Sequence, residues 1–221
     1  MILFDIGANR GDATIAGLNK GFTKVIALEP APRIYAELVK NFIYEPRVKP
    51  LKLAVSDQDA KRIEFYEADE DGLSTINKDW LTDELMPYNG KPFRTVKATT
   101  ITVDTLAKLY GKPDLIKVDV EGAEWSVFKG MSQKLGTLTF EWSQATLDEH
   151  HNQLDYLMRL GYTEFAPQFI EHHLQEPEHW YKFGHYTLYM WWRDHYEAWQ
   201  NGDWRKSGLR PTPDVGMCWV K

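Results

Sequence analysis

The feature that most constrains the fold is a short apolar segment followed directly by a glycine-containing turn. Residues 2–6, Ile-Leu-Phe-Asp-Ile, are apolar except for Asp5, as expected of a strand buried on both faces. Gly7 and Gly11 bracket the turn, and a helical pattern begins at Ala13. A strand, a glycine turn and a helix in this order predict a nucleotide-binding corner. Its ligand is expected at the carboxyl end of the strand, beside the helix N-terminus.

The residues of the turn restrict which nucleotide fits. A dinucleotide site has the pattern Gly-x-Gly-x-x-Gly, because its second glycine lets the backbone approach a pyrophosphate. Ala8 and Asn9 stand where that glycine is needed, and the chain has no Gly-Lys-Ser or Gly-Lys-Thr of a P-loop. The carboxylate of Asp5, close to the turn, repels a pyrophosphate and attracts a cation. These charges favour S-adenosylmethionine, which carries an ammonium and a sulfonium but no phosphate.

An acidic residue follows the second predicted strand. Residues 24–28 form another apolar run, and Glu29 stands directly after it, 22 positions beyond Gly7. In folds of this kind an acidic residue at that place holds a ribose diol. The alternative is a solvated carboxylate at a strand end. We favour the ribose role because of the glycine turn that precedes it.

Two further acidic residues lie near the ends of later predicted strands. Asp119 is placed at the carboxyl end of an apolar run over residues 115–120, where burying an unpartnered carboxylate is costly. It either caps the next helix or contacts a substrate hydroxyl or the methionine part of the cofactor. We favour contact, because Asp5 and Asp119 would end neighbouring central strands at the expected crevice. Glu141, near the end of a predicted strand over residues 135–142, is a candidate for the same crevice.

Four segments, in this order and spacing, resemble the FkbM family of class I S-adenosylmethionine-dependent methyltransferases. They are Asp-Ile-Gly-Ala-Asn-Arg-Gly (5–11), Ala-Leu-Glu-Pro (27–30), Leu-Ala-Val-Ser-Asp (53–57) and Ile-Lys-Val-Asp-Val-Glu-Gly-Ala-Glu (116–124). The most specific piece is Val-Asp-Val-Glu-Gly-Ala-Glu. The resemblance implies S-adenosylmethionine as the cofactor. It also implies methyl transfer to a hydroxyl oxygen on a small natural product or a sugar.

The expected cofactor-binding residues lie in the glycine turn or at strand ends. The resemblance implies that Ser56 and Asp57 reach the adenine, with Asp57 accepting a hydrogen bond from the exocyclic amine. The alternative for Asp57 is an Asx turn. The full set expected to bind the cofactor is Asp5, Gly7, Asn9, Gly11, Glu29, Ser56, Asp57 and Asp119.

A hydroxyl acceptor must lose its proton as it attacks, and the sequence leaves the general base open. Asp119, Glu141 and His172 are the candidates. His172 belongs to a segment, residues 167–184, that is rich in histidine, glutamate and aromatic residues. That segment is expected to form a loop where a substrate lid is plausible. No spacing in it matches a zinc signature, so we expect no metal.

The remaining pattern predicts one α/β domain over residues 1–221. We expect a doubly wound, mostly parallel, seven-stranded Rossmann-like sheet, whose last strand, residues 185–192, is antiparallel. Residues 58–98 interrupt the alternation of strands and helices with two strand-like pieces joined by a loop. We interpret them as a β-excursion after the third strand, with residues 72–77 over the ligand mouth. Residues 193–221 form an aromatic-rich C-terminal tail.

Charge and cysteine content narrow the possible partners. The net charge is −6 without an evident basic patch, so nucleic acid and anionic membranes are not expected, and a small hydroxylated molecule is. Cys218 is the single cysteine, and the chain shows no signal peptide or membrane-spanning run, which predicts a cytoplasmic protein. Two other functions compete: a nicotinamide-dependent oxidoreductase of Rossmann type, and a protein that binds S-adenosylmethionine without catalysis. The oligomeric state is left open.

Overall fold

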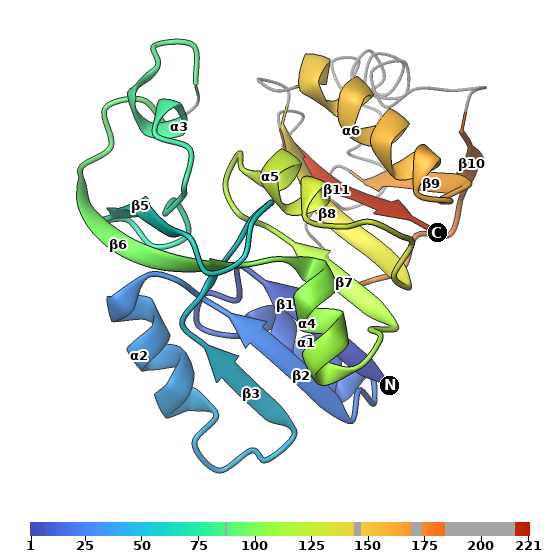
Figure 1. The fold of residues 1–221 in the computed structure, drawn as a ribbon, viewed down its shortest axis with the longest axis horizontal. Helices are drawn as coiled ribbons and strands as arrows, with labels where there is room; N and C mark the ends of the chain where they lie inside the picture. The colour runs from blue at the N-terminus through green and yellow to red at the C-terminus, as the bar shows by residue number, and fades with distance from the viewer. Residues whose placement is uncertain (87, 144–146, 169–173, 184–214) are drawn as a thin grey trace, which may run out of the picture.

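A computed structural model describes residues 1–86, 88–143, 147–168, 174–183 and 215–221. Within these residues the chain forms an eight-stranded sheet with helices on both faces, and a three-stranded sheet stands beside it (Figure 1). This architecture confirms the predicted doubly wound α/β class. In spatial order the strands of the large sheet are β10 (Tyr181–Lys182), β9 (Glu164–Gln168), β11 (Val215–Val220), β8 (Thr137–Ser143), β7 (Leu115–Val118), β1 (Ile2–Ile6), β2 (Lys24–Leu28) and β3 (Val48–Leu51).

The strand order contains a topological switch point between β1 and β7. Strands β3, β2, β1, β7 and β8 run parallel to one another. The chain moves outward from β1 through β2 to β3, then returns to the other side of β1 to form β7. Ligands of open α/β sheets bind outside the carboxyl ends of the strands at such a reversal. The fold therefore places a crevice where the sequence predicts the nucleotide site.

Helices cover the two faces of the large sheet with separate apolar cores. Helices α4 (Val103–Tyr110), α5 (Glu124–Lys129) and α6 (Leu147–Arg159) pack on one face, and α1 (Asp12–Asn19) and α2 (Pro32–Asn41) pack on the other. Successive side chains of a strand point to opposite faces, so Phe4 and Ile6 join the first core while Leu3 joins the second. No helix in the described ranges is both long and apolar enough to cross a bilayer.

The predicted β-excursion is present and forms the small sheet. It contains β5 (Arg62–Ala68) and β6 (Phe93–Ile101), which pair antiparallel, and the short helix α3 (Asp79–Thr82) between them. The predicted third strand, residues 48–55, is divided. Its first part is β3, and its last two residues form β4 (Ala54–Val55), which leaves the large sheet and pairs with β6. The pairing with β6 hydrogen-bonds residues that would otherwise extend a sheet edge.

The C-terminal end of the chain differs from the prediction. The expected last strand, residues 185–192, lies outside the described residues. Within the described residues the large sheet contains two antiparallel strands, the two-residue β10 and the longer β11, and β11 comes from the segment predicted to be a tail, residues 193–221. It lies between β8 and β9 and is antiparallel to both, and Cys218 and Val220 on it are fully buried. Among the described residues the large sheet thus has eight strands, including the two-residue β10, where seven were expected for the chain.

The carboxyl ends of β1 and β7 approach each other closely at Gly7. This residue has φ 75°, and a Cβ added to it would lie 1.7 Å from the carbonyl oxygen of Asp119. The amide of Asp119 donates to the carbonyl of Ile6, and the amides of Gly7 and Ala8 both donate to the carbonyl of Leu28. Three central strands therefore converge on a position that only glycine can occupy.

We expect Gly7→Ala to lower the free energy of unfolding by at least about 2 kcal/mol more than Gly21→Ala. Both glycines have positive φ, so each substitution carries a similar backbone strain, of about 1 kcal/mol. A Cβ at Gly21 meets nothing within 4 Å, whereas one at Gly7 overlaps the backbone. Urea denaturation followed by circular dichroism measures both losses, and equal losses would contradict this account.

Candidate functional site

A cavity of about 280 Å³ opens at the carboxyl edge of the large sheet. Its wall includes Gly7 after β1, Glu29 after β2, Asp119 after β7 and Glu141 on β8. The excursion also contributes lining residues, Gly72, Ser74 and Ile76, which belong to the segment predicted to lie over the ligand mouth. The cavity therefore occupies the switch point of the sheet and is partly roofed by the excursion.

The cavity brings together only part of the predicted site. The predicted residues that line it are Gly7, Asn9, Glu29, Asp119 and Glu141. Those that do not line it are Asp5, Gly11, Ser56 and Asp57. His172 lies outside the described residues, so the structure says nothing of its place.

Asp5 is fully buried and does not line the cavity. Its side chain lies on the face of β1 that meets α1, where Thr14 Oγ1 donates to Asp5 Oδ2 at 2.6 Å. Lys117 Nζ lies 3.8 Å from Asp5 Oδ1. The carboxylate is fully buried, and this burial raises its pKa. In this structure the contacts of the carboxylate are with Thr14 and Lys117, and its role towards a cationic ligand remains a prediction.

Gly11, Ser56 and Asp57 lie beside the cavity. Gly11 has φ 101°, and a Cβ there would meet the ring of Phe42 at 2.2 Å, so this glycine serves the packing of α1 against α2. Ser56 Oγ donates to Asp57 Oδ1 at 3.0 Å, directly after the wall residues 53–55. Contact of this pair with an adenine remains a prediction.

Glu29 connects the cavity wall to the glycine turn. Its Oε2 accepts from the amide of Asn9 at 3.0 Å, and its Oε1 accepts from the amide of Ala31 at 2.8 Å. Burial raises the pKa of Glu29 to about 7, although both backbone hydrogen bonds oppose the rise. One side chain thereby fixes the turns after β1 and β2 relative to each other.

Lys117 is a site residue that the motif analysis did not select. It lies on β7 with a side-chain exposure of only 6%, and its Nζ is 2.9 Å from Asp119 Oδ2. The same ammonium donates to the carbonyl of Gly7 at 3.0 Å. The available signal was a single charge within the apolar run Leu-Ile-Lys-Val, since a buried lysine needs acidic or carbonyl partners.

Three carboxylates gather at one end of the cavity. Oxygens of Asp119, Glu121 and Glu141 lie within 4.8 Å of one another. Trp80 Nε1 donates to Glu121 Oε2 at 3.1 Å. Burial raises the pKa of Glu121 well above its ordinary value, and the nearby charge of Asp119 raises it further. Such oxygens suit the hydroxyl groups of a ligand. They are also the ligand type of hard cations, but Lys117 and Trp80 already engage two of the three.

The excursion is fastened to this acidic end. Asn77 Nδ2 donates to the carbonyl of Gly122 at 3.1 Å. The indole of Trp80 packs directly on Gly122, where a Cβ would lie 2.6 Å from the ring. Gly122 and Glu121 both have positive φ, so the backbone after β7 turns to make room for the indole. The excursion therefore packs against the turn after β7, and its indole contacts the carboxylate of Glu121.

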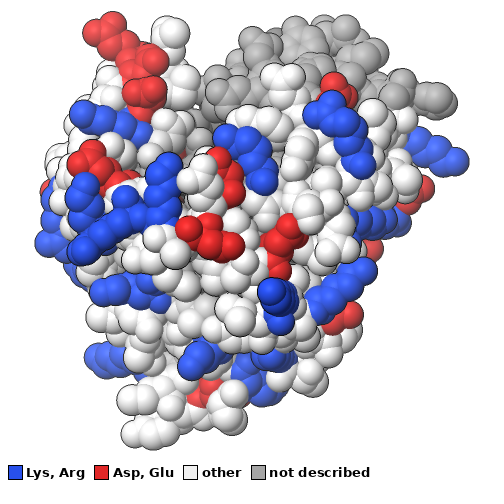
Figure 2. Space-filling model, in the orientation of Figure 1, with Lys and Arg blue, Asp and Glu red and all other residues white. Residues whose placement is uncertain are grey.

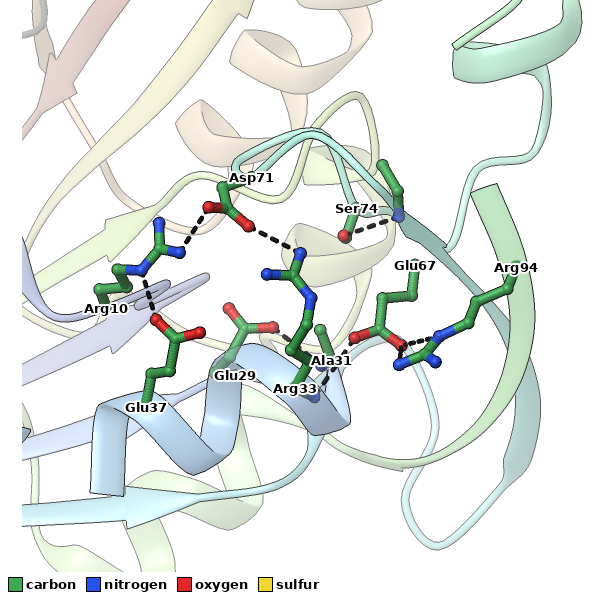
Figure 3. A network of polar contacts seen from close by, with 10 residues as sticks. Arg10, Glu29, Ala31, Arg33, Glu37, Glu67, Asp71, Ser74 and Arg94 are labelled. Atoms are coloured by element: carbon green, nitrogen blue, oxygen red, sulfur yellow. Dashed lines mark hydrogen bonds and ion pairs between the residues drawn. The ribbon is translucent and has the colours of Figure 1, made fainter. Parts of the chain in front are cut away.

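A second set of contacts joins the excursion to the glycine turn and α2 (Figure 3). Asp71 lies on the excursion and forms two ion pairs. Its Oδ2 is 2.5 Å from Nη2 of Arg10, in the glycine turn, and its Oδ1 is 2.7 Å from Nη2 of Arg33, in α2. Arg10 also contacts Glu37 of α2 at 2.6 Å. The hydrogen bond from Arg33 and the one from Arg10 lower the pKa of Asp71. These pairs are partly exposed, so their effect depends on acting as a network.

Charges of both signs cover the face of the molecule drawn in Figure 2, and lysine and arginine gather on the side of β5, β6 and α2. Several of these cations are paired within the excursion. Arg94 binds Glu67 at 2.8 Å, and Lys97 lies 3.2 Å from Glu64. The cations on this side therefore act in part as structural partners of the small sheet.

Comparison with known proteins identifies a family. The model of the methyltransferase FkbM domain matches residues 5–198, which include the glycine turn and all the described carboxylates of the cavity. Among curated proteins, none matches this chain.

Solved structures with a similar fold share little sequence. A precorrin-6Y C5,15-methyltransferase from Geobacter metallireducens is 12% identical, with a TM-score of 0.45 over 100% of this chain and 79% of that one. An S-adenosylmethionine-dependent O-methyltransferase from Thermotoga maritima is 11% identical, with a TM-score of 0.40 over 99% of this chain and 58% of that one. The functional assignment therefore rests on the family match and not on these structures.

The raised pKa of Glu29 predicts a pH-dependent stability. Because burial raises this pKa from 4.5 to about 7, the folded protein holds the proton more tightly than the unfolded chain. The resulting stabilisation is complete below about pH 4.5 and is lost as pH rises through 7. Glu29→Gln does not titrate, so we expect its free energy of unfolding to rise by roughly 2 to 3 kcal/mol relative to the wild type between pH 5 and pH 8.

Urea denaturation across this pH range measures the difference. Glu64→Gln, which changes an exposed glutamate of β5, is the control and should follow the wild type over the same range. A curve for Glu29→Gln that also runs parallel to the wild type would show that Glu29 is ionised throughout.

We expect Asp71→Ala to release the excursion loop. The substitution removes two ion pairs at once, so cleavage by a nonspecific protease within residues 72–86 should accelerate roughly three- to tenfold. Glu70→Ala is the matched control, because Glu70 contacts only Lys91 among the described ion pairs, within the excursion itself. Mass spectrometry of early fragments gives the cleavage rates. Equal acceleration in both variants would show that the ion pairs of Asp71 do not hold the excursion loop to the glycine turn and α2.

Proposed function

Because this chain belongs to the FkbM family of methyltransferases, we propose that it methylates a hydroxyl oxygen on a small natural product or a sugar. Membership of this family implies S-adenosylmethionine as the cofactor. It gives no support to the alternative of a nicotinamide-dependent oxidoreductase. The acceptor class is the proposed part. The observation that carries it is the cavity at the switch point, which has a glycine turn on one side and three carboxylates on another.

The residues of the cavity fit this cofactor. Gly7 leaves the turn without a side chain, and Asn9 Oδ1 is buried with no hydrogen-bond partner among the described residues. That oxygen can accept a hydrogen bond from a ligand ammonium or hydroxyl. Glu29 stands where a ribose diol is expected, and the apolar wall residues Leu53 and Phe65 suit an adenine ring. We propose Gly7, Asn9, Glu29 and Asp119 as cofactor-binding residues on this basis.

When bound, the cofactor supplies an electrophilic methyl group on its sulfonium. The protein contributes alignment and the exclusion of water, and the excursion loop with Trp80 suits the second task. A hydroxyl acceptor also requires a group that takes its proton. Asp119 and Glu141 remain candidates for this role, and we add Glu121, whose carboxylate lines the same cavity and whose pKa is raised by burial.

The carboxylates also bear on the choice of acceptor. Their oxygens accept hydrogen bonds from hydroxyl groups, as a sugar offers in several directions. Their negative charges disfavour an acceptor that carries phosphate or carboxylate groups. We therefore expect neutral or cationic hydroxylated molecules as acceptors.

Calorimetry with S-adenosylmethionine, S-adenosylhomocysteine and NAD tests the cofactor site. We expect saturable binding of the two adenosyl ligands and none of NAD. Glu29→Ala should raise the dissociation constants of both adenosyl ligands about tenfold or more, because it removes the expected ribose contact and the hydrogen-bond acceptor of the amides of Asn9 and Ala31. Glu64→Ala, on the exposed side of the excursion, should bind as the wild type does.

A screen of acceptors follows with radiolabelled methyl donor. Neutral sugars and hydroxylated metabolites are tested beside their phosphorylated counterparts, and methylation is expected only in the first group. Binding of NAD alone, or methylation confined to phosphorylated acceptors, would refute the proposal.

A further inference from the structure

Lys117 occupies a position where a lysine is costly. It lies on β7 between β1 and β8, in the middle of the large sheet. Each neighbouring residue of β7 is apolar and fully or almost fully buried, and the lysine side chain itself is 6% exposed. An ammonium in such surroundings is stable only where anionic or carbonyl groups replace its water. The partners of this lysine therefore indicate what it does.

The partners of Lys117 belong to two different surroundings. Asp5, 3.8 Å from the ammonium, is buried beneath the cavity and also binds Thr14. Asp119 Oδ2, at 2.9 Å, and the carbonyl of Gly7, at 3.0 Å, belong to residues of the cavity wall. The ammonium thus reaches from the core to the wall across the junction of β1 and β7.

The charge of Lys117 acts on most of the acidic groups around the cavity. Burial raises the pKa of Asp5, Glu29 and Glu121, and in each case the positive charge of Lys117 opposes the rise. Within the described ranges the ammonium stays within 4 Å of both Asp5 and Asp119. Its removal would leave Asp5 buried without a cation and Asp119 without a fixed orientation.

We propose that Lys117 is a positioning residue of the cofactor site, which fixes the carboxylate of Asp119 and the carbonyl of Gly7 relative to each other. A carboxylate rotates about the bond to its Cβ unless one oxygen is held, and Lys117 holds Oδ2. The orientation of Asp119 towards the cavity then depends on this contact. The inference rests on the proposed cofactor site but not on the class of acceptor.

The test must separate positioning from stability. Lys117→Met alone leaves Asp5 buried and uncompensated, so this variant is expected to fold poorly. Adding Asp5→Asn removes that charge, and Asp5→Asn alone serves as the reference, so any effect of Asp5 cancels. We expect the Asp5→Asn/Lys117→Met variant to melt close to its reference. Its dissociation constant for S-adenosylmethionine, measured by calorimetry, should rise at least about tenfold over the reference.

Lys24→Met in the same background is the matched control. Lys24 also donates to a backbone carbonyl, that of Tyr110, but it lies at the start of β2, far along the strand from the cavity edge. This control should lower the melting temperature without changing the affinity for S-adenosylmethionine. If Lys117 served stability alone, Lys117→Met would likewise lower the melting temperature and leave the affinity for S-adenosylmethionine unchanged.

A double-mutant cycle with Asp119→Asn identifies the group that Lys117 positions. All variants of the cycle carry Asp5→Asn. When Asp119→Asn is also present, adding Lys117→Met should raise the dissociation constant for S-adenosylmethionine less than about threefold, because the carboxylate that Lys117 orients is already absent. An undiminished loss would overturn positioning through Asp119, as would an affinity of Asp5→Asn/Lys117→Met equal to its reference. Absence of binding by the wild type would instead refute the proposed cofactor site.

Discussion

The site depends on the close backbone approach between the turn after β1 and the end of β7. The carbonyl oxygen of Asp119 occupies the space where a Cβ of residue 7 would stand, so only glycine permits the contact. Because these two segments meet, one ammonium, that of Lys117, reaches the carbonyl of Gly7 and the carboxylate of Asp119 together. The position of the cavity between β1, β2 and β7 follows from the same junction.

The acidic character of the cavity follows from how the strands end. Glu29, Asp119 and Glu121 all come just after the carboxyl ends of parallel strands, which meet at one edge of the sheet. Burial raises the pKa of Glu29 and Glu121, so this edge stores unfavourable charge that a cationic ligand would relieve. The excursion contacts this edge directly: Trp80 donates to Glu121, which opposes the rise in the pKa of this carboxyl, and Asn77 donates to the carbonyl of Gly122. The excursion and the acidic residues of the cavity wall are thus linked through the contact of Trp80 with Glu121.

The sequence predicted the strands and the switch-point crevice because continuous apolar runs ending in glycine or acid leave little choice of structure. It did not predict the contact of Asp5 with Thr14, because the alternation of side chains along β1 turns this residue towards α1. The roles of Lys117 and Trp80 could not be predicted. Their partners, the Gly7 carbonyl and Glu121, lie 110 and 41 positions away, and only the folded topology brings them together. Likewise, β11 was missed because a six-residue run gives no sign of which strands it joins.

The central claim is that the cavity between Glu29 and Asp119 holds the cofactor. The most direct measurement is a crystal structure with S-adenosylhomocysteine bound. The account predicts density along this cavity, with the ribose hydroxyls against the carboxylate of Glu29 and the amino acid end near Asn9, Gly7 and Asp119. Density at any other place, or a ribose without contact to Glu29, would contradict it.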